Sequence, residues 1–136
     1  MYKKIVTWPN KVLSETCAPI VLGLEDSHKL LDDLKDTFRV LQGYGLAAPQ
    51  IGHSVNAFVI NPQLLEIDGY EEEVLEVLNP SISCSGELVQ VEEVCFSIPE
   101  ISAYVPRYEK CILTFYDREG NLEKLNLSGY PAACVQ

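Results

Sequence analysis

Cys95 is the residue whose neighbours are most suggestive of chemistry. It follows an acidic pair at 92–93 and precedes the turn-forming residues Ser-Ile-Pro-Glu at 97–100. A cysteine nucleophile needs a base, usually a histidine, close to it in space. The chain has two histidines, His28 and His53, and the sequence does not show that either meets Cys95. Taken by itself, Cys95 is therefore more typical of a buried structural thiol.

A second stretch, residues 43–52, reads Gly-Tyr-Gly-Leu-Ala-Ala-Pro-Gln-Ile-Gly. Gly45 and the alanines after it add little bulk, so the backbone here can approach another chain or a ligand closely. A generic connector between two elements has a similar composition. The stretch alone therefore identifies no site.

The chain has 136 residues, and we expect it to form one domain covering residues 1–136. Its formal net charge of -10 argues against nucleic-acid binding, because such proteins carry a basic patch or stripe. The acidic residues at 71–73 and Glu76 are most simply a solvated surface.

The first residues lack the apolar core of a secretory signal, and no apolar run approaches the length of a membrane span. We therefore expect a cytoplasmic protein without membrane contact. The five cysteines are odd in number and widely spaced, which does not indicate a disulfide framework. Cys111 and Cys134 have apolar neighbours and fit small buried hydrophobic residues.

The elements that must position these residues are one helix followed by many strands. Residues 24–41 carry apolar side chains at spacings of three and four, which predicts an amphipathic helix that Asp26 or Ser27 caps and Gly43 ends. Strands are expected at 55–60, 74–78, 109–116 and 122–127, and at 82–91 around Ser85-Gly86. Asn79-Pro80 is expected to separate the strand at 74–78 from the one at 82–91. Gly120 predicts a hairpin turn between the strands at 109–116 and 122–127. This order indicates an α+β domain with mainly antiparallel sheet.

Residues 128–136 resemble the opening of a second helix, with Ser128 as its cap and Pro131 at an early position. Only about one and a half turns are present, and a helix this short is marginal alone. We therefore expect the helix to be truncated here.

Two segments together resemble the peptide deformylase family. The first family motif, Gly-x-Gly-Leu-Ala-Ala-Pro-Gln, matches residues 43–50 fully, and the second, Glu-Gly-Cys-Leu-Ser, matches at Glu93, Cys95 and Ser97. Val94 and Phe96 depart from the second motif. The resemblance continues through Val-Pro-Arg at 105–107, the Asp-x-x-Gly turn at 117–120 and the closing residues 129–136, so it spans nearly the whole chain.

The resemblance implies a metal-dependent hydrolase that removes the formyl group from the N-terminal formyl-methionine of new polypeptides. It implies that Cys95 is a metal ligand and that the Gln50 side chain and the Phe96 backbone N–H stabilise the oxyanion. Substrate-binding residues are implied at Tyr44, Gly45, Leu46, Val94, Arg107, Tyr130, Ala133 and Cys134. One divalent metal ion is implied, natively iron(II), with zinc, nickel or cobalt also compatible with cysteine and histidine ligands.

The implied partners are nascent formyl-methionyl peptides near the ribosome. The resemblance also implies a monomer in the cytosol of a bacterium, an organelle or a virus-infected host. In the family, two histidines and a glutamate of a His-Glu-x-x-His motif complete the metal site directly after the position of Gln136. The 136 residues do not include that motif. We therefore expect a C-terminally shortened form of a working enzyme, inactive without that motif. The alternatives are a non-catalytic module that binds peptide termini and a purely structural domain.

Overall fold

The structure, a computed structural model, describes residues 1–7, 9–20, 25–41, 43–65, 74–95 and 97–136. At positions 25, 94, 95, 98–101 and 130 it describes the backbone but not the side chain. Of the acidic residues expected on a solvated surface, 71–73 lie outside the described residues, whereas Glu76 is half-buried and pairs with Arg118.

One five-stranded antiparallel sheet runs through the described part of the chain in the order β1-β2-β3-β4-β5. The strands are β1 (Gly45–Ala47), β2 (Ala57–Ile60), β3 (Leu75–Cys95), β4 (Ile98–Tyr116) and β5 (Leu122–Ser128). The helices are α1 (Glu25–Leu41) and α2 (Tyr130–Val135), with short 3-10 helices η1 (Lys11–Ser14), η2 (Ala48–Ile51) and η3 (Pro62–Leu65). The expected α+β class with mainly antiparallel sheet is confirmed.

Helix α1 forms where the apolar periodicity predicted it. Leu31 and Leu34 are fully buried, and Leu30 and Phe38 nearly so, because they share the face that packs on β1 and β2. The expected capping by Asp26 or Ser27 is wrong, since the helix already begins at Glu25. Asp26 instead lies in the first turn, where the helix dipole favours a negative charge.

The expected break at Asn79-Pro80 is wrong, because β3 runs through it, and through Ser85-Gly86, as one strand. Its pairing with β4 shifts register at each of these points, as at a β-bulge. Asn79 has φ 47° and Gly86 has φ 87°, and both residue types tolerate this left-handed conformation. Pro80 lies at the first shift, where its missing N–H costs no ladder hydrogen bond.

The side chain of Asn79 holds the N-terminal segment against the first bulge. Its Oδ1 accepts from Ile20 N at 2.8 Å and its Nδ2 donates to Ile20 O at 2.9 Å. The Asn79 backbone N–H donates to Asn56 O at 2.9 Å. One residue thus joins β3 to two segments that precede it in the chain.

The hairpin between β4 and β5 is confirmed. Gly120 adopts φ 88° in the turn and its N–H donates to Asp117 O at 3.0 Å. Asp117 Oδ1 also accepts from Asn121 N at 2.8 Å. Tyr116 and Leu122 form the first strand pair beyond the turn.

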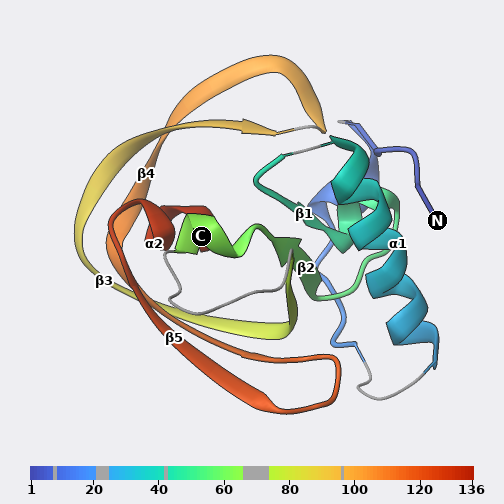
Figure 1. Ribbon diagram of the computed structural model, residues 1–136. Coiled ribbons are helices and arrows are strands. Elements are labelled where there is room, and N and C mark those ends of the chain that lie inside the picture. The colour runs from blue at the N-terminus through green and yellow to red at the C-terminus, as the bar shows by residue number, and fades with distance from the viewer. Residues whose placement is uncertain (8, 21–24, 42, 66–73, 96) are drawn as a thin grey trace.

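Helix α2 starts after Gly129, whose φ is 66°, and no side chain caps it, so the expected Ser128 cap is wrong. Ser128 instead ends β5, while Pro131 occupies the early helical position that was expected. Figure 1 shows the long strands β3 and β4 curving around α2, with α1 beside β1 and β2.

The buried apolar residues form two clusters, one at α1 and one at α2. The first joins α1 to β1 and β2 and includes Leu31, Leu34, Leu46 and Val59. The second lies under α2 and includes Val77, Cys111, Leu113, Phe115 and Ala132. The sheet therefore separates a core under α1 from a core under α2.

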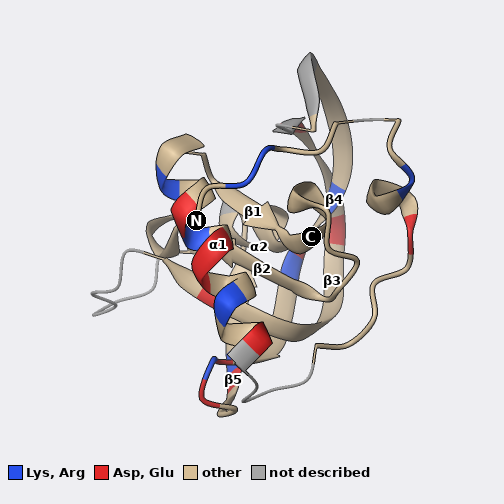
Figure 2. Cartoon of the chain, turned by 90° about the vertical axis from the view of Figure 1, so that its right-hand side faces the viewer, with Lys and Arg blue, Asp and Glu red and all other residues tan. Residues whose placement is uncertain are grey.

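Charged residues of both signs gather on α1 and around the turn before β5 (Figure 2). Arg118 connects the two places, since its Nη2 donates to Asp32 on α1 at 2.8 Å and to Glu76 on β3 at 2.5 Å. His28 Nε2 lies 3.2 Å from the Arg118 carbonyl oxygen. None of the helices among the described residues combines the length and the apolar character that crossing a bilayer requires.

Candidate active site

Gln50 lies in η2, directly after β1, and its carboxamide is held at both ends. Its Oε1 accepts from the backbone N–H of Ala47 at 2.9 Å. Its Nε2 donates to Ser97 Oγ at 3.4 Å, although the two residues are 47 positions apart. The fold therefore brings the two motifs together, with the donor end of Gln50 directed at the second.

Gly45 lies where only glycine fits easily. It pairs with Ile60, and a Cβ at this position would stand 3.0 Å from the backbone oxygen of Val59. Strand β1 is at one end of the strand order, so within the described residues β2 is its only strand partner. Its other edge can accept an extended peptide as an added strand.

The second motif lies at the tip of the β3–β4 ribbon. Cys95 is the last residue of β3 and pairs with Ile98, the first residue of β4. Ser97 is almost completely buried, at 2% exposure. Phe96 lies outside the described residues, and so do the side chains of Val94 and Cys95. The backbone of Val94 pairs with Ser102.

Arg107 makes a two-point ion pair on this ribbon. Its Nε and Nη2 each donate to the Glu93 carboxylate at 2.6 Å. These hydrogen bonds hold the pKa of the Arg107 guanidinium above its usual value. Glu93 thus restricts where the arginine can reach, because a bidentate pair fixes both side chains.

The remaining expected substrate residues lie in different surroundings. Tyr44 is exposed, whereas the Leu46 side chain is buried in the core under α1, so Leu46 can reach a ligand only through its backbone. Ala133 is buried and Cys134 half-buried in α2, which packs on β4, β5 and η3. The Tyr130 side chain lies outside the described residues.

Comparison with known proteins decides the family. The family model described as polypeptide deformylase matches residues 2–136. The chain belongs to the polypeptide deformylase family. A peptide deformylase from Helicobacter hepaticus is 32% identical over 133 residues, which cover 97% of this chain and 74% of that protein.

Solved deformylases share the fold. The crystal structure of peptide deformylase from Ehrlichia chaffeensis has a TM-score of 0.86 at 31% identity and covers 100% of this chain and 80% of its own. A Met-Ala-Ser-bound class I type b peptide deformylase from Acinetobacter baumannii has a TM-score of 0.85 at 26% identity, over 100% of this chain and 89% of its own.

Deformylases use a metal ion, which needs several donor side chains close together in space. Among the described residues, no group of three or more histidine, cysteine, aspartate or glutamate side chains is placed to hold one. Cys95 is the one position matched to a family ligand, whereas a catalytic site typically takes about three protein ligands. The donors in the described part of the chain therefore do not by themselves complete the deformylase metal site.

Sequence reasoning did not predict that Ser97 contacts Gln50 or that Glu93 pairs with Arg107. Ser97 and Glu93 both belong to the second motif, and that membership was the available signal. These contacts form only when distant segments pair, and a local motif contains no information on that pairing.

Proposed function

We propose that this protein is a peptide deformylase, a hydrolase that releases formate from N-formyl-methionyl peptides. The observation that carries the proposal is the contact between Gln50 and Ser97, because it joins the two family motifs at one place. The match of the family model to residues 2–136 supports the same function.

In the proposed reaction, Gln50 stabilises the oxyanion that develops on the formyl oxygen. The Ala47 N–H occupies Oε1, so the amide is oriented with Nε2 as its donor toward the Ser97 end of the site. A donor held in this way requires little reorganisation when charge develops. The Phe96 backbone N–H is proposed as the second donor.

The substrate is proposed to lie along the free edge of β1. Gly45 and Val94 would pair with its backbone, because an extended peptide can add to an exposed sheet edge. Tyr44, Leu46, Arg107, Tyr130, Ala133 and Cys134 are proposed to contact the peptide or its methionine side chain. The Acinetobacter baumannii relative, which was solved with Met-Ala-Ser bound, supports a substrate of this class.

Cys95 is proposed as the thiolate ligand of the deformylase metal, natively iron(II), with zinc, nickel or cobalt able to replace it. The further ligands implied by the family are not among residues 1–136. The metal is therefore to be tested on the longest form of the protein that its gene encodes. The proposed setting is the cytoplasm, where a monomer meets nascent chains near the ribosome.

Formate release from a formyl-Met peptide tests the function, with bound metal measured on the same sample. We expect Cys95→Ala to abolish both signals. Cys17→Ala is the matched control, because Cys17 is a half-buried free thiol near the N-terminal segment, and it should keep both. Peptide binding without formate release or bound metal would instead show a non-catalytic module and contradict the proposal.

A further inference from the structure

Cys84 and Cys111 lie directly opposite each other on β3 and β4. Their sulfur atoms are 3.0 Å apart. The pair is flanked by Ser83 with Ile112 and by Ser85 with Lys110, and Cys111 also pairs with Leu127 on β5. The sheet therefore fixes the register that places the two thiols together.

This register suits a disulfide. Directly opposed residues of antiparallel strands have Cα atoms about 4.5 to 5.5 Å apart. A disulfide accepts Cα separations of about 4.4 to 6.8 Å. Closing the bond therefore requires side-chain rotation and no slip of the strands.

The two thiols differ in their surroundings. Cys111 is buried under α2, and its Sγ lies 3.7 Å from the Ala132 carbonyl oxygen. Burial, and next the contact with Cys84, raise the pKa of the Cys111 thiol to about 12. Cys84 is half-buried at the edge of the same cluster, and so is the more accessible of the two.

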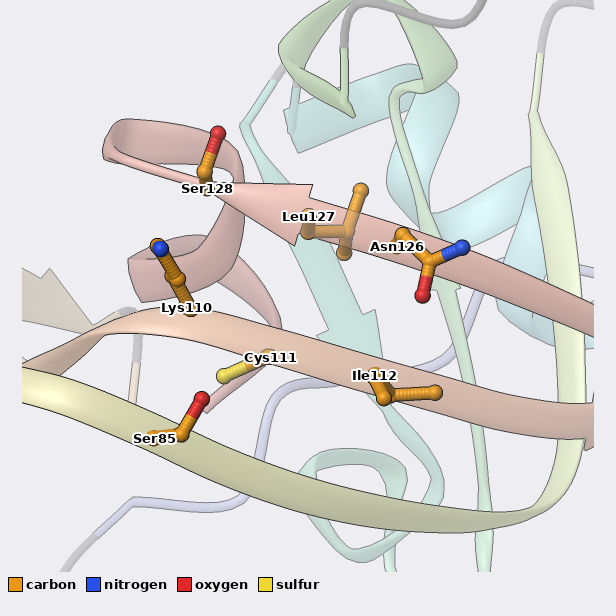
Figure 3. Close-up of a pocket in the computed structure, with 7 residues that line it drawn as sticks. All are labelled: Ser85, Lys110, Cys111, Ile112, Asn126, Leu127 and Ser128. Atoms are coloured by element: carbon orange, nitrogen blue, oxygen red, sulfur yellow. The ribbon is translucent and has the colours of Figure 1, made fainter.

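An opening in the surface reaches Cys111. Ser85, Lys110, Cys111 and Asn126 are among the residues that line a pocket between β3, β4 and β5. Figure 3 shows Cys111 directed from β4 toward the strand that carries Ser85. A small oxidant can therefore approach Cys111 from this side, and the Cys84 sulfur lies 3.0 Å from the Cys111 sulfur.

We propose that Cys84 and Cys111 form a redox-active dithiol, a modification site at which hydrogen peroxide produces a reversible cross-strand disulfide. The Cys84 thiol gives up its proton and its sulfur attacks peroxide, so that an S–O bond forms and the O–O bond breaks. The departing hydroxide takes up the proton from the thiol and leaves as one water. The Cys111 sulfur then attacks the Cys84 sulfur, forming the S–S bond, and the S–O bond breaks as a second water leaves with the Cys111 proton. Two thiols lose two electrons in total, and one peroxide is reduced to two waters.

The disulfide would link β3 to β4 beneath α2 and remove the Cys111 thiol from the Ala132 carbonyl oxygen. Disulfides of cytosolic proteins are usually transient and catalytic or redox-sensing. In the proposed cytoplasmic setting, the pair is therefore a reversible switch rather than a permanent cross-link.

Peptide mapping after peroxide treatment tests the proposal without reference to activity. Cleavage after acidic residues isolates Cys84 between Glu76 and Glu87, and tryptic cleavage isolates Cys111 between Lys110 and Arg118. We expect the two peptides to appear as one linked species, lighter than the sum of the reduced peptides by two hydrogens, about 2 Da. Dithiothreitol should separate them again.

Cys84→Ser and Cys111→Ser should each lose the linked species, while Cys17→Ser should retain it. The thermal midpoint of the parent should rise on oxidation and return on reduction, because a cross-link restricts the unfolded chain. Mapping of the parent alone suffices if a variant does not fold. Separate alkylation of Cys84 and Cys111 after peroxide, or linkage to another cysteine or another chain, would overturn the proposal.

Discussion

The neighbours of Gln50 orient its carboxamide for the proposed role in oxyanion stabilisation. The Ala47 N–H fixes its oxygen and Ser97 receives its Nε2, so the orientation is set before a substrate arrives. A side chain held in this way serves a transition state better than a mobile one, because its dipole is already aligned.

Gln50→Ala is therefore expected to lower kcat/KM for a formyl-Met peptide by about 10²- to 10³-fold. The change in kcat/KM is measured by formate-release kinetics on the metal-loaded protein. Gln63→Ala is the control, since Gln63 is exposed in η3, and its activity should match the parent. Equal activity of the two variants would exclude Gln50 from oxyanion stabilisation.

Asn79 has a structural role of similar importance at the residue scale. Asn79→Ala removes both side-chain hydrogen bonds to Ile20 and places alanine at φ 47°. We expect a loss of about 2 to 4 kcal/mol in the free energy of unfolding, from two hydrogen bonds and left-handed strain. Urea denaturation measures it, and Asn126→Ala on the exposed side of β5 should change it little.

The buried thiol also predicts a pH dependence. Burial raises the pKa of Cys111 from 9.0 to about 12, so the unfolded thiol ionises before the folded one. Its contribution to stability is full below about pH 9 and is lost as the pH rises toward 12. Between these values the reduced parent should lose stability more steeply than Cys111→Ala. Parallel curves from thermal unfolding would contradict this.

At the scale of elements, Arg118 ties the turn between β4 and β5 to α1 and β3. Its side chain is 22% exposed, and its two partners, Asp32 and Glu76, are on different elements. These ion pairs therefore stabilise contacts between elements and not a single helix. The exposed pair of Arg39 with Asp36 lies within α1 and has a smaller expected effect.

Arg118→Ala should accordingly cost about 1 to 3 kcal/mol in the free energy of unfolding, because it leaves the half-buried Glu76 carboxylate without this partner. Arg39→Ala should cost under about 0.5 kcal/mol. Urea denaturation of both variants measures the difference. A similar loss in both would show that Arg118 acts as an ordinary surface charge.

The same scale shows which elements the sequence makes predictable. The spacing of Leu31, Leu34 and Phe38 predicts α1, and Gly120 predicts the last hairpin, because both signals are local. Asn79-Pro80 predicts a break between two strands where the structure has a bulge in one strand, since a bulge and a turn favour the same residue types. Only the pairing with β4 distinguishes them.

For the whole molecule, motif resemblance identified the family, and the order of one helix followed by many strands predicted the antiparallel α+β fold. It also named Gln50 and Cys95, but not the partners that hold or restrict the site residues. Ser97 meets Gln50, and Cys84 meets Cys111, only when strands of distant sequence adopt their final register. Such contacts have no local signature, so a structure was needed to find them.

The 47 positions between Gln50 and Ser97 also have a consequence for the order of folding. The β3–β4 ribbon can grow from its own tip, whereas contacts between remote segments must first overcome the entropy of closing a long loop. We expect the scaffold to form before the oxyanion donor is aligned. In pulsed hydrogen exchange during refolding, the Ala47 amide should therefore gain protection later than amides near the tip of the ribbon.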